Sequence, residues 1–409
     1  MSTNYEIPET RVLAIASHVV YGYVGNTMAT FVLQSLGCEV SAINTVHYSN
    51  HTAYKQVKGR KTTAEEISEL YEGLKQSNLT DFDVLLTGYT PSAEAVEAVG
   101  RIGRDLKFHA NTKPGSFFWV LDPVMGDEGR LYIPEEEVPV YKTHLRNADL
   151  ILPNQFEAEL LSDTKIRNLD TLAEAIQILH RTHQIPHIII TSLRFTESGT
   201  TVPYSADYDS GTLTIVGSTA RADHTPRLFR IDVPAFPIFF SGTGDMFAAL
   251  TVARLRGAVF EAGVNKAQRW VSPDDVPSTE LPLAKAAEEV LASMQAVLRK
   301  TYAAWDKERK LLDEEMGDVR AGQQSGKEGM SQEKMRRHLR LTKAAEVKLV
   351  RNVDDLRHPP DSEKYKAQEV IVHVGQSVGQ PQPDELGITN LGGEGLQSAI
   401  HIDNTNQRN

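Results

Sequence analysis

The sequence predicts an α/β fold: a doubly wound, mostly parallel sheet flanked by helices. From about residue 11 onward, short continuous apolar runs alternate with stretches of helical spacing. Continuous apolar runs are typical of strands that are buried on both faces of a parallel sheet. Hydrophobic residues make up 40% and charged residues 24% of the 409 residues, as in ordinary folded domains. We expect a single large domain with a charged insertion.

The elements follow in order along the chain. Residues 11–17 predict the first buried strand, residues 24–37 a helix that ends at Gly37, and residues 38–46 the next strand. A surface helix begins at Thr63, because Thr63 and Glu66 have the spacing of a capping box. Four more strand-like runs are each followed by a helical stretch: residues 83–89, 117–123, 149–154 and 186–192.

After residue 192 the pattern changes. Residues 201–233 predict short antiparallel strands, residues 243–255 and 283–302 predict helices, and residues 369–374 again resemble a strand. Residues 304–338 are rich in charged side chains and poor in apolar ones, which is typical of a solvated insertion. Residues 374–409 are rich in Gly, Gln and Asn, which is typical of a disordered tail. The predicted organisation is an N-terminal tail (1–10), a folded domain (11–303 plus 339–373), a partly disordered charged insertion (304–338) and a disordered tail (374–409).

Charge and composition exclude several classes of protein. The net charge of −11 disfavours nucleic acid as a partner, because an acidic surface repels phosphate backbones. Cys38 is the single cysteine, so neither an intrachain disulfide nor a cysteine-based zinc cluster can form. The polar N-terminus lacks the apolar core of a signal peptide, and no apolar run is long enough to cross a bilayer. We expect a cytoplasmic protein without membrane association.

Polar residues stand at the carboxyl ends of several predicted strands. They are Ser17, Tyr89, Asp122, Asn154, and Thr191 with Ser192. Any one of them alone is more commonly a turn former or a helix cap. In doubly wound sheets, however, ligands bind outside the carboxyl ends of the strands. Five such positions therefore predict a shared pocket at that edge.

The strongest local motif is SGTGD, residues 241–245, directly before a helix. Two glycines around Thr243 leave backbone N–H groups free to point at an anion, helped by the helix dipole. Such donors suit a phosphoryl group during transfer, and Asp245 is placed to accept a proton from an attacking hydroxyl. The alternative is that Asp245 only stabilises the helix N-terminus, by about 0.5–2 kcal/mol.

Two further loops carry carboxylates. The run DPVMGDEG places Asp122 and Asp127 after a strand, where they form either one side of a magnesium site or a simple turn. Asn154 and Glu157 have a spacing that suits an outer-shell magnesium site, but the spacing alone favours a capping box. The run GQQSGKE, residues 322–328, has one residue too few between its glycines for a phosphate loop, so we discard it as a nucleotide site.

Taken in order, these segments resemble the pyridoxal kinases of the ribokinase-like family. The resemblance is carried by SHVVYGYVGN, INTVHYSNHTAY, LTGY, DPVMGDEGRLYIPE, ILPNQFEAELLS, IIITS and SGTGDMFAAL, and more faintly by KLVRNVDDL. It covers most of residues 11–303. The GTGD and DPV motifs occur across the wider family, whereas SHVVYGYVGN, SNHTAY and LTGY are narrower. The resemblance implies ATP-dependent phosphorylation of the 5′-hydroxymethyl group of pyridoxal, pyridoxine and pyridoxamine, with Mg²⁺ or another divalent cation, by a homodimer.

The resemblance also implies roles by position. Asp245 resembles the general base, and Gly242, Thr243 and Gly244 resemble the anion hole. Ser17 would hydrogen-bond the pyridine ring, in a pocket lined by Val46, His51, Thr52 and Tyr89. The ATP and metal surroundings would comprise Asp122, Asp127, Tyr132, Asn154, Glu157, Thr191, Ser192 and Thr243, with Asp122 and Glu157 nearest the metal.

One position departs from the family pattern. Leu152 stands where some relatives carry Thr in a monovalent-cation site, and leucine supplies no side-chain oxygen, so K⁺ would need a backbone carbonyl instead. Two other functions stay open on the residues alone. The chain could phosphorylate a hydroxymethylpyrimidine or a sugar, or it could be a catalytically silent binding protein that retains the fold.

Overall fold

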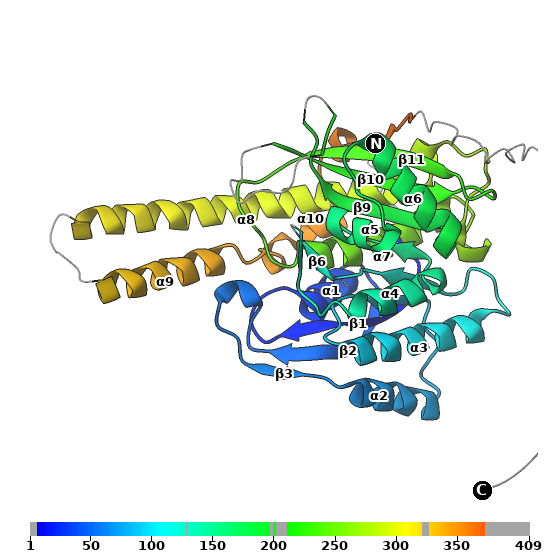
Figure 1. Cartoon of the computed structure of the whole chain (residues 1–409), viewed down its shortest axis with the longest axis horizontal. Coiled ribbons are helices and arrows are strands. Elements are labelled where there is room, and N and C mark those ends of the chain that lie inside the picture. Colours follow the sequence, from blue (N-terminus) through cyan, green and yellow to red (C-terminus); the bar gives the residue numbers. More distant parts are fainter. Residues whose placement is uncertain (1–5, 128, 197–198, 202–210, 321–326, 373–409) are drawn as a thin grey trace, which may run out of the picture. The chain divides into compact units, whose positions relative to one another are not determined.

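The computed structural model describes residues 6–127, 129–196, 199–201, 211–320 and 327–372, apart from the side chains of 316–320 and 327–331 (Figure 1). The tail expected at 374–409 and most of the GQQSGKE run lie outside these residues. The chain up to His373 groups into one unit. Among the helices of the described ranges, none combines the length and the apolarity that a membrane crossing requires.

The described unit is built on a ten-stranded mixed sheet, which confirms the predicted fold class. Its order is β12-β11-β10-β9-β8-β5-β4-β1-β2-β3. The six strands from β9 to β2 pair in parallel, whereas β10, β11 and β12 at one edge and β3 at the other pair antiparallel. The strands are β1 Arg11–Val19, β2 Glu39–Tyr48, β3 Gly59–Lys61, β4 Val84–Thr87, β5 Phe118–Leu121, β8 Leu150–Ile151, β9 His187–Leu193, β10 Thr212–Ala220, β11 Pro226–Pro234 and β12 Gln368–Glu369. A separate hairpin joins β6 Gly126–Asp127 to β7 Arg130–Leu131.

Both faces of the sheet are covered, because successive strand residues point to opposite sides. Val12 and Leu86 belong to one hydrophobic core, and Leu13 and Leu85 belong to the other. The first core contains residues of α1 Gly25–Ser35, α7 Thr243–Glu261, α8 Pro282–Arg320 and α10 Val353–Arg357. The second contains residues of α2 Ala64–Gln76, α3 Ala93–Ala110, α4 Glu137–His144, α5 Gln155–Ser162 and α6 Leu169–His183. The 3₁₀ turns are η1 Thr52–Tyr54, η2 Leu145–Asn147, η3 Gln268–Trp270, η4 Ser278–Glu280, η5 Val350–Asn352 and η6 Ser362–Tyr365.

Both predicted capping boxes are present. The Thr63 side chain accepts a hydrogen bond from the backbone N–H of Glu66, whose carboxylate accepts from the backbone N–H of Thr63 at the start of α2. Asn154 and Glu157 make the same reciprocal pair at the start of α5. Local side-chain spacing therefore fixes where these two helices begin.

Two long helices lie in the region around the predicted insertion. Helix α8 continues to Arg320 instead of ending near Tyr302, and α9 Lys327–Ala344 lies beside it (Figure 1). Ion pairs join the two helices: Arg340 contacts Glu308 and Glu315 at 2.7 Å each, and Arg337 contacts Asp313 at 2.7 Å. Charges that a single helix would leave in solvent are here partners across a helix pair. Of the strand expected over 369–374, the last two residues lie outside the described ranges; β12 covers Gln368 and Glu369, and residues 370–372 are not in a strand.

Candidate active site

The SGTGD motif forms a sharp turn into α7, and Gly242 is required there. Its φ of 81° lies in the left-handed region, and a Cβ at this position would stand 2.1 Å from the carbonyl oxygen of Tyr23. Glycine also has no side chain with which to cap the helix. The first N–H groups of α7 are therefore left for an anion, as the motif predicts.

Asp245 lies where β1 and β4 end and α1 begins. The backbone N–H of Gly25 donates to its carboxyl group, and a Cβ on Gly88, directly after β4, would be 3.9 Å from Asp245 Oδ1. Burial raises the pKa of Asp245 to about 6, against the effect of the Gly25 hydrogen bond. A carboxyl group with this pKa is mostly ionised at neutral pH yet is a stronger proton acceptor than a free aspartate. It is suited to act as a general base.

Asp122 follows β5 and faces the same turn. It is buried, 8% exposed, and a Cβ on Gly244 would stand 3.8 Å from its Oδ2. Burial raises the pKa of Asp122 well above its usual range, and the charges of Glu157 and Asp245 raise it further. Negative charge on Glu157 and on Asp245 thus repels that of Asp122 at the carboxyl ends of the central strands. A bound cation would relieve that repulsion.

Glu157 performs the capping role and also holds the loop before β6. Its Oε1 accepts from the backbone N–H groups of Met125 (2.9 Å) and Gly126 (3.3 Å), and its Oε2 accepts from that of Asn154 (2.9 Å). Asn154 Nδ2 in turn donates to the Gly126 carbonyl at 2.7 Å. Burial raises the pKa of Glu157 to about 8, although these three hydrogen bonds oppose the shift. The capping interpretation is confirmed, and contact with a metal stays a prediction.

The acidic groups fit a metal that arrives with phosphates. Within the described ranges, no group of three or more His, Cys, Asp or Glu side chains is arranged to hold a metal ion. Asp122 and Glu157 offer two carboxylates at most. Mg²⁺ is ordinarily bound in this way, by one or two carboxylates together with phosphate oxygens and water. Leu152 is 4% exposed in the hydrophobic core and offers no side-chain oxygen to a second cation.

A cavity of about 490 Å³ opens beside the turn into α7, a size that suits a small ligand. Five of the residues predicted around ATP line it, together with Gly244 of the predicted anion hole: Asp127, Asn154, Thr191, Ser192 and Thr243. Tyr132, expected near the phosphates, is 61% exposed and does not line the cavity. Asp122 and Glu157 are not among the lining residues either.

The cavity has walls that the sequence interpretation missed. Lys165, which is paired with Glu159 at 2.7 Å, and Arg194 line it, and apolar side chains come from β10, β11, α8 and the segment before α7. Examples are Ile215, Val233, Phe240 and Leu298. The apolar run AFPIFF, residues 235–240, stands directly before SGTGD and was the one local signal for this wall. An apolar slot with basic residues nearby suits a flat base that carries phosphates.

The predicted vitamin residues gather on the other side of the turn. Val46 is buried in β2, and Tyr89 follows β4, where its carbonyl accepts from Thr45 Oγ1 at 2.7 Å. Burial raises the pKa of Tyr89 to about 12, so its hydroxyl stays a hydrogen-bond donor. His51 is buried and precedes the exposed Thr52 on η1.

Two contacts join this side to the anion turn. A Cβ on Gly25 would stand 2.3 Å from Ser17 Oγ, and the N–H of the same glycine reaches Asp245. His51 Nδ1 lies 3.3 Å from the hydroxyl of Ser241, the residue before Gly242. The structure therefore brings the predicted base, the anion turn and the predicted substrate residues to one place. Gly25 and Ser241 were not singled out from the sequence.

Comparisons with known proteins agree on one group. A family model described as phosphomethylpyrimidine kinase matches residues 33–274. Pyridoxal kinase of Homo sapiens is 40% identical over 255 residues, which are 60% of this chain and 77% of that protein. Pyridoxal kinase of Arabidopsis thaliana is 35% identical over 295 residues, which are 71% and 82%. The solved structure of pyridoxal kinase from Leishmania donovani in complex with ADP and pyridoxamine matches with a TM-score of 0.64 and 29% identity, over 88% of this chain and 98% of that one.

Proposed function

Since the chain belongs to the pyridoxal kinase family, we propose that it transfers the terminal phosphoryl group of ATP to the 5′-hydroxymethyl group of pyridoxal, pyridoxine and pyridoxamine. The products are the 5′-phosphates, so the reaction salvages vitamin B6. The observation that carries the proposal is the position of Asp245. It directly follows Gly244, which lines the cavity, and its carboxyl group accepts from the N–H of Gly25, which packs against Ser17. The ADP and pyridoxamine bound to the L. donovani relative support both substrates.

In the proposed reaction, ATP occupies the cavity and its terminal phosphate lies at the N–H groups of residues 242–244. The vitamin lies against Ser17, Val46, His51, Thr52 and Tyr89, with its hydroxymethyl group toward Asp245. Asp245 accepts the hydroxyl proton as the oxygen attacks phosphorus. The N–H groups stabilise the charge that spreads over the phosphoryl oxygens. Catalysis then rests on positioning and on electrostatic stabilisation.

We assign the divalent cation, Mg²⁺ or a relative, to Asp122 and Glu157 together with ATP phosphate oxygens. The cation supplies positive charge opposite the phosphates. The repulsion that Glu157 and Asp245 exert on Asp122 supports this assignment. The buried Leu152 argues against a K⁺ site built from that side chain. The homodimer and the cytoplasmic location remain predictions, as does the domain organisation with its insertion and tails.

The direct test is release of ADP with pyridoxal, hydroxymethylpyrimidine and ribose measured in parallel. The proposal predicts turnover with pyridoxal that exceeds turnover with the other two. The match to a phosphomethylpyrimidine kinase model makes hydroxymethylpyrimidine the second candidate, and preference for it would overturn the substrate assignment. Calorimetric binding of pyridoxal without ADP release from any mixture would indicate a silent binding protein instead.

A further inference from the structure

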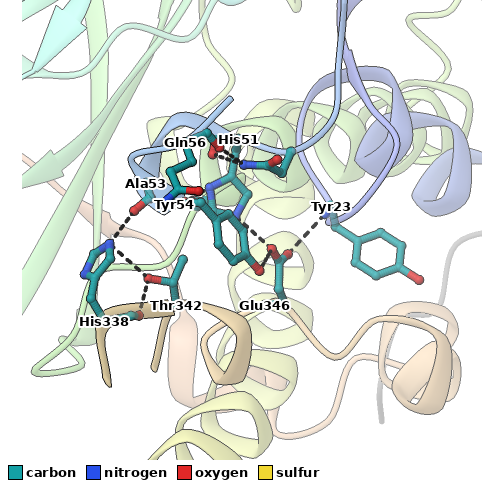
Figure 2. A network of polar contacts seen from close by, with 10 residues as sticks. Tyr23, His51, Ala53, Tyr54, Gln56, His338, Thr342 and Glu346 are labelled. Carbon is teal, nitrogen blue, oxygen red and sulfur yellow. Dashed lines mark hydrogen bonds and ion pairs between the residues drawn. The ribbon is translucent and has the colours of Figure 1, made fainter. Parts of the chain in front are cut away.

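A buried carboxylate that the reaction described above does not use lies behind the vitamin side of the site (Figure 2). Glu346 follows α9, and its side chain is 9% exposed. Its Oε1 lies 2.8 Å from His51 Nε2 and accepts from the Tyr54 hydroxyl at 2.9 Å, while an Oε2 contact of 3.3 Å comes from the backbone N–H of Tyr23. One carboxylate thus holds two loops of the predicted vitamin pocket, one after β1 and one at η1.

The protons of this network can be placed from the donors. Burial, and then the hydrogen bond to Glu346, raise the pKa of the Tyr54 hydroxyl, so Tyr54 donates. A carboxylate accepts, so His51 donates from Nε2. On the other side of the ring, His51 Nδ1 lies 3.3 Å from Ser241 Oγ. The chain Glu346–His51–Ser241 therefore ends at the residue directly before the anion turn.

The surrounding backbone is shaped around the same carboxylate. A Cβ on Gly22 would stand 2.8 Å from both Glu346 oxygens, and the φ of Gly22 is 104°. Helix α9 makes a second contact with η1, because His338 Nε2 donates to the carbonyl of Ala53 at 2.8 Å (Figure 2). Thr342 Oγ1 also donates to the carbonyl of His338 at 2.9 Å. Helix α9 and the Glu346 that follows it thereby hold the η1 loop at two points.

We propose that Glu346 is a positioning residue for phosphoryl transfer: through His51 it sets both the η1 loop of the vitamin pocket and the Ser241 end of the anion turn. This role rests on the proposed function and deepens it. It also gives the charged α8–α9 region a function: His338 lies in α9, Glu346 follows α9, and both contact the η1 loop. Fixing the tautomer and orientation of a histidine by a buried carboxylate is a recurrent way to prepare a site.

The test starts from Glu346→Gln, which keeps the shape but turns an amide N–H₂ toward groups that donate. Loss of a charged hydrogen bond predicts that the KM for pyridoxal rises by about tenfold or more. The KM for ATP should rise less than the KM for pyridoxal, because Glu346 contacts His51 and Tyr54 directly and reaches the anion turn only through His51 and Ser241. The matched control is Glu333→Gln, an exposed glutamate of α9, which should leave both constants unchanged. Equal rises in both KM values, or no rise, would overturn the proposal.

A double-variant cycle separates positioning from general stabilisation. If Glu346 acts through His51, Glu346→Gln adds little to the pyridoxal KM of His51→Asn, whereas multiplied effects contradict the proposal. If Glu346→Gln does not fold, Tyr54→Phe decides the same question, because it removes one donor to Glu346. A rise in the KM for pyridoxal alone supports the positioning role of Glu346. An unchanged KM for pyridoxal refutes it. Wild-type turnover of pyridoxal is the reference arm. If the wild type does not turn over pyridoxal, the proposed function itself is refuted. If the wild type is active and Glu346→Gln has the same KM for pyridoxal, only the role of Glu346 is refuted.

Discussion

Asp245 and Ser17 meet at Gly25, whose backbone N–H reaches the Asp245 carboxyl group and whose Cα is so close to Ser17 that a Cβ would stand 2.1 Å from the Ser17 carbonyl oxygen. One glycine therefore fixes the positions of two residues: the one expected to bind the pyridine ring, and the one expected to take the proton of the hydroxymethyl group. The relationship ties substrate position to base position without any long-range movement.

Gly25→Ala should displace both Ser17 and Asp245 and so lower both stability and activity. The φ of Gly25 is 52°, and the new methyl group would collide with backbone, so we expect a loss of about 1–3 kcal/mol in the free energy of unfolding and a large fall in kcat/KM for pyridoxal. Urea unfolding and ADP release measure the two effects. Gly73→Ala in α2 is the matched control: its Cβ meets open space, so it should stabilise by about 0.5–1 kcal/mol with full activity. Normal turnover by Gly25→Ala would show that Ser17 and Asp245 need not meet.

The rate should depend on pH through Asp245. The base must be ionised, and the pKa of this carboxyl group is about 6. Therefore kcat/KM for pyridoxal should be constant above this value and fall about tenfold per pH unit below it. A pH–rate profile that continues level to pH 5 would contradict the assignment of Asp245 as the base.

The same shift predicts a gain in stability when the charge is removed. The folded-state pKa of Asp245 is raised above its usual value, so the charged form destabilises the fold at pH values above about 6, and this effect disappears as the pH falls below the unfolded pKa. Asp245→Asn should therefore raise the Tm at pH 7.5 and have less effect at pH 4. Calorimetric scans at the two pH values check the sign, and a lower Tm at pH 7.5 would contradict it.

The cation assignment has its own test. Asp122→Asn removes one of the two proposed carboxylate ligands, so the Mg²⁺ concentration for half-maximal activity should rise by about tenfold or more, the usual effect of losing a ligand or its immediate support. Activity titrations at fixed ATP measure it. Asp170→Asn, which alters an exposed carboxylate of α6, is the control. An unchanged Mg²⁺ requirement in Asp122→Asn would remove Asp122 from the metal site.

Local rules predicted the features that depend on neighbours in the chain. The capping boxes at Thr63 and Asn154 and the turn into α7 follow from spacing within a few residues. The apolar runs predicted the parallel strands for the same reason, because a strand that is buried on both faces is apolar along its whole length. The carboxyl-end rule then located one edge of the site without knowledge of strand order.

The features that were missed depend on residues far apart. Glu346 contacts His51 across 295 positions, and nothing near Glu346 marks it as different from the charged residues around it. The length of α8 was underestimated because Arg340 pairs with Glu308 from another helix. The apolar wall of the cavity likewise combines β10, β11 and α8. Such partners become visible only when the chain is folded.

The central claim is that Asp245 accepts the proton from the vitamin hydroxyl while the N–H groups of residues 242–244 hold the phosphoryl group. Its most direct test is the turnover of Asp245→Asn with ATP and pyridoxal, beside calorimetric binding of an ATP analogue. A general base of this kind is worth about 10²–10⁴ in rate, so we predict a fall of that size in kcat with binding of the analogue retained. Turnover within a few-fold of the wild-type rate would contradict the account.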